Sequence, residues 1–100
     1  MNMQALMKQA QNMQKDINRM KDEIDNTVFE GRSSLVSVEM MGNKTVKSIK
    51  FSSEIKEIAQ DDLTMVEDMV VVALNDAIQK IDSEVEKKMG KYSNMLPGLM

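Results

Sequence analysis

The first quarter of the chain carries apolar residues in an unbroken alternation of three- and four-residue steps. They are Met3, Leu6, Ala10, Met13, Ile17, Met20 and Ile24. This spacing places the side chains in one narrow line along a helix, which is the a/d pattern of a coiled-coil seam. Residues 1–25 are therefore predicted to form one helix, roughly 33 Å long at 1.5 Å per residue, that projects from the rest of the fold.

The opposite face of this helix is basic and rich in amides. No acid occurs before Asp16. Lysine and arginine neutralise phosphates, and amide side chains can bind phosphates or base edges. The helix is thus predicted to hold a partner along its seam and an anion, DNA or RNA, along its back. The candidate contacts are Lys8, Gln11, Asn12, Lys15 and Arg19.

The composition argues against catalysis. The chain has 100 residues, no cysteine and no histidine, so it lacks the usual zinc ligands and nucleophile–base pairs. Acids such as Asp61-Asp62 stand where helix starts commonly carry them. Twelve methionines could suggest Cu(I), but their helical spacing favours packing. We predict no enzyme activity, no metal, no cofactor and no small-molecule substrate.

The middle of the chain, residues 27–52, has the pattern of a β-sheet. Residues 35–40 alternate at period two and put Val36, Val38 and Met40 on one face. Gly42-Asn43 predicts a type II′ hairpin turn, and a return strand over 44–52 carries Ile49 and Phe51. A bulge is expected near Lys47-Ser48, where the alternation breaks. Residues 28–30 could add a third strand before a loop at 31–34.

A second long helix is predicted over 61–90. Its apolar residues, which include Val70 and Leu74, form a broad stripe of period 3.6, as in a helix that covers a sheet. Asp61 or Asp62 is expected near its N-cap and Gly90 at its end. Lys87, Lys88 and Lys91 form a second basic zone that could extend the nucleic-acid surface. Residues 91–100 are expected to be a flexible tail.

The order of helix, strands and helix predicts an α+β fold in a single domain, 1–100. A hairpin with one helix leaves sheet edges open and buries little surface. A homodimer is therefore expected, with projecting helices. The residues expected to form the core or the dimer contact are Val36, Val38, Met40, Ile49, Phe51, Val70 and Leu74.

Three functions remain open from the residues alone. The first is binding of nucleic acid through the basic back of the N-terminal helix. The second is a protein-interaction scaffold, in which the methionine-rich seam holds a partner helix. The third, attachment to an anionic membrane surface, is weaker because the seam is narrow and lacks aromatic residues. No apolar run approaches the length of a membrane span.

Four collinear stretches resemble the YbaB/EbfC family of bacterial nucleoid-associated proteins. Residues 6–14 (LMKQAQNMQ) are similar to the family's opening motif, and residues 35–49 to its hairpin. Residues 61–77 resemble its DD…LEDLV.AA.NDA helix, and 95–99 its LPG tail.

The resemblance implies a small cytoplasmic, nucleoid-associated homodimer. Its long helices would project from a central sheet like tweezers and grip double-stranded DNA with modest sequence selectivity. Such a protein would affect nucleoid organisation and gene expression. The chain departs from the family in a shortened glycine-rich loop, 31–34, and in a net charge of −3 with few cations on the candidate grip.

Overall fold

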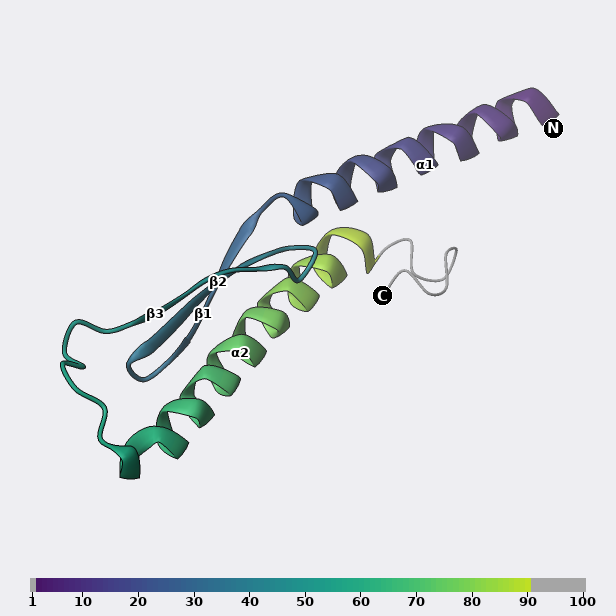
Figure 1. The fold of residues 1–100 in the computed structure, drawn as a ribbon. Coiled ribbons are helices and arrows are strands. Elements are labelled where there is room, and N and C mark those ends of the chain that lie inside the picture. The colour runs from purple at the N-terminus through teal and green to yellow at the C-terminus, as the bar shows by residue number, and fades with distance from the viewer. Residues whose placement is uncertain (1, 91–100) are drawn as a thin grey trace.

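The computed structural model describes residues 2–90. The elements are helix α1 (Met3–Asp25), strands β1 (Val28–Ser33), β2 (Val36–Met41) and β3 (Val46–Phe51), the short 3-10 helix η1 (Gln60–Asp62) and helix α2 (Leu63–Met89). Figure 1 shows α2 lying along one face of the sheet and α1 extending away from it. The predicted α+β fold, with a three-stranded antiparallel sheet between two long helices, is confirmed. The tail predicted at 91–100 lies outside the described residues.

Helix α1 runs from Met3 to Asp25, within the residues 1–25 predicted to form it. Asn2 is the N-cap, and its side-chain Oδ1 accepts a hydrogen bond from the Gln4 N–H at 3.0 Å. At the other end the Asn26 N–H donates to the carbonyl oxygens of the last turn. The Thr27 hydroxyl donates to the Glu23 carbonyl at 2.6 Å. These bonds satisfy the carbonyl oxygens of Asp22, Glu23 and Ile24, and the chain then enters β1.

The sheet has β2 at its centre, paired with β1 on one side and β3 on the other. Val36, Val38 and Met40 of β2 are 2%, 0% and 2% exposed. They form the buried face, as the period-two alternation predicts. The bulge predicted in β3 is also present, because the pairing passes from Glu39–Ser48 to Met40–Val46 and leaves Lys47 as the extra residue.

The first turn of the sheet differs from the prediction. Residues 31–34 are predicted as a loop, but β1 continues to Ser33, and only Ser34 and Leu35 connect it to β2. Ser34 adopts the left-handed region, with φ of 49°. Gly31 is needed for the close approach of β1 to α2 and not for a turn, because a Cβ there would lie 2.1 Å from the Ala73 carbonyl oxygen of α2.

The type II′ prediction for the second hairpin turn is wrong. The left-handed residue is Lys44, with φ of 70°, and its N–H donates to the Met41 carbonyl at 2.7 Å. This geometry is that of a three-residue loop, 42–44, and it shortens β3 to Val46–Phe51. Gly42 is required for a different reason, since a Cβ there would lie 1.8 Å from the Ile24 carbonyl oxygen.

Helix α2 packs on β1 and β2 through its small residues. Ala73 and Ala77 are fully buried, and they let the helix backbone approach Gly31 closely. Val70 and Leu74 lie beside them and are half-buried against the same core. The predicted broad apolar stripe therefore covers the sheet, and the helix ends at Met89 as expected from Gly90.

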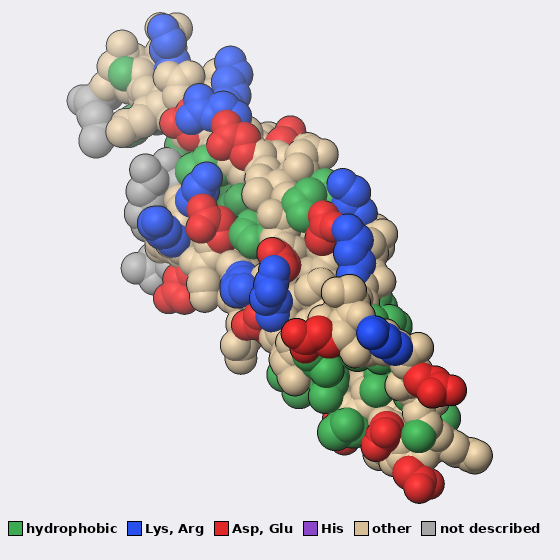
Figure 2. Space-filling view, turned by 90° about the vertical axis from the view of Figure 1, so that its left-hand side faces the viewer, with side chains coloured by type: hydrophobic (Ala, Val, Ile, Leu, Met, Phe, Trp, Pro, Cys, Tyr) green, Lys and Arg blue, Asp and Glu red, His purple; other side chains and the backbone are tan. Residues whose placement is uncertain are grey.

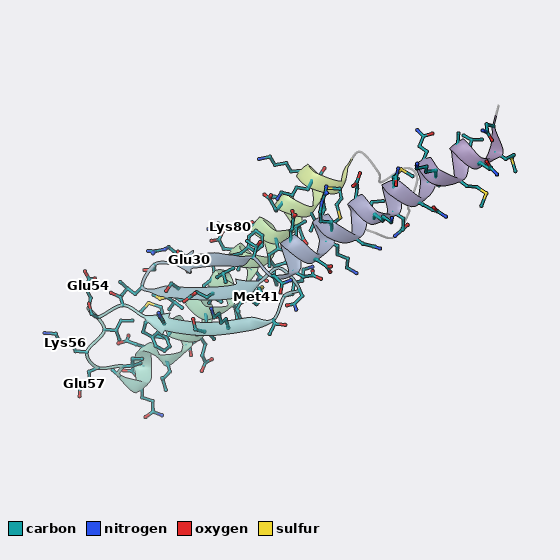
Figure 3. The ribbon with its side chains drawn as sticks, turned by 90° about the horizontal axis from the view of Figure 1, so that it is seen from above. Glu30, Met41, Glu54, Lys56, Glu57 and Lys80 are labelled. Atoms are coloured by element: carbon teal, nitrogen blue, oxygen red, sulfur yellow. The ribbon has the colours of Figure 1, made fainter. Side chains whose placement is uncertain are left out.

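A polar contact also joins α2 to β1. The Arg32 N–H donates to Asp76 Oδ2 at 2.9 Å, and Lys80 Nζ lies 3.3 Å from the same oxygen. Lys80 also donates to the Glu30 carbonyl at 2.7 Å, and both residues are labelled in Figure 3. The hydrogen bond from the Arg32 N–H lowers the pKa of Asp76 the most, and the hydrogen bond from Lys80 lowers it further.

Candidate nucleic-acid interface

The seam of α1 is buried only near the sheet. Ile17 and Ile24 are 2% and 3% exposed, whereas Met3 and Leu6 are 72% and 41% exposed. The N-terminal half of α1 therefore projects from the body, and the molecule measures 70 × 20 × 15 Å. Projection frees both the seam and the back of this half of the helix for contact with other molecules.

The basic back of α1 lies in solvent along the whole candidate stripe. Lys8, Gln11, Asn12, Lys15 and Arg19 are all exposed. At 100° per residue, the cations of this set lie opposite the seam, on one face. Figure 2 shows lysine and arginine side chains at the upper end and along the middle of this face, with acids among them, and mainly acidic and hydrophobic side chains at the lower end.

The three cations of the stripe differ in whether an acidic side chain pairs with them. Arg19 lies 3.6 Å from Asp16 and 4.0 Å from Glu23, so part of its charge is compensated within the helix. Lys8 and Lys15 form no ion pair with any residue in 2–90. The two lysines are therefore the cations of the stripe that are best placed to meet phosphates.

The second basic zone lies near the base of α1. The last turns of α2 run beside α1 (Figure 1), and Met89 is buried like Ile17. Lys88 pairs with Glu84 at 3.5 Å, while Lys87 is exposed. Lys91 lies outside the described residues. The structure thus brings Lys87 and Lys88 to the end of the body from which α1 projects.

An open apolar strip runs along the side of α2 that is next to β3. Val46, Ile49 and Phe51 of β3 pair with the three buried residues of β2, so they share the core face. They are nevertheless 43–48% exposed, because α2 covers β1 and β2 but not β3. Val71 of α2 is 55% exposed and lies on the flank of the helix where Asp82 reaches Lys44 of the hairpin.

This strip, Val46, Ile49, Phe51 and Val71, includes two residues expected in the core or a dimer contact. Ile49 and Phe51 are not in the core of the single chain. Val46 and Val71 are absent from the sequence-based set. The bulge at Lys47 brings Val46 onto the face of Ile49, and the unusual phase of Val46 was the signal for it.

The described residues offer little for other functions. Among residues 2–90 no group of three or more acids forms a possible metal site. Within the same residues no helix is long and apolar enough to cross a membrane.

Comparison with known proteins identifies the family. The model of the YbaB/EbfC DNA-binding family matches residues 1–96. The chain belongs to the YbaB/EbfC DNA-binding family. It is 43% identical to a nucleoid-associated protein of Ligilactobacillus salivarius, over 99% of this chain and 95% of the relative. A nucleoid-associated protein of Lactococcus lactis subsp. cremoris is 42% identical, over 97% and 98% of the two chains.

A solved structure supports the fold alone. An uncharacterized protein from Helicobacter pylori superposes with a TM-score of 0.67 at 18% identity, covering 95% of this chain and 97% of the other. Family membership confirms the prediction of a nucleoid-associated DNA-binding protein and not an enzyme.

Proposed function

We propose that this YbaB/EbfC protein acts at the nucleoid as a homodimer that grips double-stranded DNA with the backs of two α1 helices. The observation that carries the proposal is the exposed Lys8–Lys15 stripe on a helix that stands clear of the body. From Lys8 to Arg19 the stripe extends about 16 Å at 1.5 Å per residue, which is about five base pairs along a duplex.

Charge and shape both suit a duplex. An α-helix fits the major groove, where Gln11 and Asn12 could reach base edges while the lysines contact phosphates. Most of the contacts would go to phosphates, which position a protein but carry little sequence information. Modest sequence selectivity follows. Through such binding the protein would influence nucleoid organisation and gene expression.

The open apolar strip of β3 and α2 supports the dimer. The chain exposes 7455 Å², whereas a folded monomer of 11.3 kDa exposes about 5700 Å². A second copy on the strip Val46, Ile49, Phe51 and Val71 would cover the uncovered third of the core face. It would also supply the second α1 helix that the grip needs.

The test is the salt dependence of binding to mixed-sequence duplex DNA. Three cations from each of two protomers give a log–log slope near −5 at about −0.9 per phosphate contact. The slope would be shallower if Arg19 stays paired with Asp16 and Glu23. Replacing Lys8 and Lys15 with Ala should reduce the slope by about 4 and weaken all sequences alike.

A matched control removes two lysines elsewhere. Lys47 lies in β3, and Lys56 lies in the connection after β3, at the end of the molecule far from α1. Both are exposed, and neither forms an ion pair within residues 2–90. Changing both to Ala removes the same charge and should leave most of the slope. If the Lys8/Lys15 variant stays folded and dimeric but keeps the wild-type slope, the grip lies elsewhere, and Lys87 and Lys88 are tested next. If the wild type shows no salt-sensitive DNA binding at all, the scaffold function is favoured instead.

A further inference from the structure

The end of the molecule opposite α1 carries a small apolar groove. It is lined by Ile55, Ile58, Met65 and Met69, among others, from the connection after β3 and the start of α2. Its volume is about 230 Å³, below the roughly 300–1,000 Å³ of small-molecule pockets. Ile58 and Met65 are 37% and 53% exposed. The groove therefore suits anchoring side chains of a protein segment better than a metabolite.

The rim of this groove is acidic, and its carboxylates have no cationic partner within residues 2–90. Glu54 and Glu57 stand on the connection, on either side of Lys56, at the end far from α1 (Figure 3). Asp62 occupies the N-cap position of α2 without a side-chain cap bond. Residues 52–68 contain six acids and one lysine. None of the six acids forms an ion pair within residues 2–90.

The tip of α1 has the complementary properties. Met3, Leu6, Met7 and Ala10 stand at i, i+3, i+4 and i+7, the anchor spacing of helices that dock in grooves. Met3 and Met7 are 72% and 60% exposed, so nothing in the described chain covers them. The first turn of α1 has no acid to offset the positive end of its helix dipole.

We propose that the α1 tip of one copy docks in the far-end groove of another copy, with Leu6 and its neighbours against Ile58 and Met65. After the β3–α2 strip is assigned to the dimer, the tip and the far end are the two remaining clusters of exposed large hydrophobic residues in 2–90. They have opposite electrostatic character, which favours contact between unlike ends. The acidic rim would meet the uncompensated N-terminal end of α1.

Such a contact joins different surfaces of two copies and is therefore heterologous. A heterologous contact that does not close into a ring produces open chains. The docked seam faces away from Lys8 and Lys15, so the basic back stays available to DNA. Dimers joined in this way would line up along a duplex, and the protein would bind cooperatively.

The test uses the full-length protein without DNA, so its outcome is separate from that of the DNA grip. Sedimentation velocity at rising concentration should show wild-type species larger than the dimer, and added salt should reduce them. Leu6→Gln and Ile58→Gln should each weaken this association about tenfold or more, the cost of losing one buried aliphatic side chain. The control Val72→Gln changes a residue of α2 that is 54% exposed and outside both clusters, and should have no effect.

Mixing the two variants gives the decisive measurement. Leu6→Gln dimers keep intact grooves, and Ile58→Gln dimers keep intact tips, so the 1:1 mixture should form alternating chains although neither variant assembles alone. Circular dichroism would verify that both variants remain folded. Failure of the mixture to form species larger than the dimer would overturn the tip-to-groove contact. Assembly of one variant alone would also overturn it, because that result would mean tip-to-tip or groove-to-groove pairing. A wild-type protein that stays dimeric at all concentrations would also refute it.

Discussion

The two long helices of this protein both carry apolar residues along one side but use them differently. The stripe of α2 is broad and meets a sheet, so Ala73, Ala77 and Ile81 are at most 1% exposed. The seam of α1 is narrow, and only its last turns meet other elements, which leaves Met3 and Leu6 exposed. Periodicity thus fixes which side of a helix is apolar, whereas burial depends on what lies opposite.

This difference has consequences for stability and for function. Side chains of α2 stabilise the single chain, because their burial removes apolar surface from water. Side chains at the tip of α1 contribute almost nothing to the single chain and are available for contact with other molecules. The body of the protein holds the fold, whereas the tip of the projecting helix keeps its apolar side chains exposed.

The largest expected effect comes from shortening one core side chain of α2. Ile81→Ala should lower the free energy of unfolding by about 2–5 kcal/mol, because it leaves a cavity beside Met40 and Ala77. Leu6→Ala at the tip of α1 should change it by no more than about 0.5 kcal/mol. Urea denaturation at one fixed protein concentration measures both. A large loss in Leu6→Ala at a dilution at which dimers do not associate further would mean that the tip packs within the folded unit.

A smaller effect is expected at the junction between the two regions. Gly42→Ala places a methyl group against the Ile24 carbonyl and must displace the end of α1, at a cost of about 1–3 kcal/mol. The control is Gly90→Ala, where a Cβ would lie 3.9 Å from the nearest side-chain atom, Glu86 Cγ, and φ is −56°. That change should be neutral or stabilising by up to about 1 kcal/mol. Equal losses in both variants would remove the close-approach explanation for Gly42.

The sequence predicts most of the fold because its elements have strong periodic signals. The helical form of α1 follows from the three- and four-residue spacing of its apolar residues, and the buried face of β2 follows from simple alternation. The turns are harder to predict, since Gly31 and Gly42 resemble turn residues but serve close backbone contacts. A close contact depends on a distant segment, and local sequence carries no direct record of it.

The candidate site is predictable in part for the same reason. The basic back of α1 is visible from helical spacing alone, and the structure confirms that it is exposed. The pairing of Arg19 with Asp16 and Glu23 is also local, at three and four residues. The exposure of Ile49 and Phe51 could not be predicted, because it depends on how far α2 extends over the sheet.

The smallest expected effect concerns the polar contact that holds β1 to α2. Asp76→Asn keeps an acceptor for the Arg32 N–H but removes the negative charge near Lys80. The hydrogen bonds from Arg32 and Lys80 lower the pKa of Asp76 in the folded state. An unfolded chain has an ordinary aspartate pKa of about 3.9. The charged form therefore stabilises the fold above that value, and this contribution disappears as the pH falls through the lower, folded-state pKa.

The variant should accordingly be less stable than the wild type at neutral pH and converge on it in acid. Urea denaturation at a series of pH values measures the difference between the two proteins, which cancels the titration of their common acids. Asp68→Asn is the matched control, since Asp68 is an exposed acid of α2 that forms no ion pair within residues 2–90. Its free energy of unfolding should stay close to that of the wild type. A gap between Asp76→Asn and wild type that stays constant from neutral to acid pH would mean that geometry at Asp76, and not its charge, holds β1 on the helix. The contribution of this contact to the free energy of unfolding would then be as independent of pH as that of the apolar core beneath it.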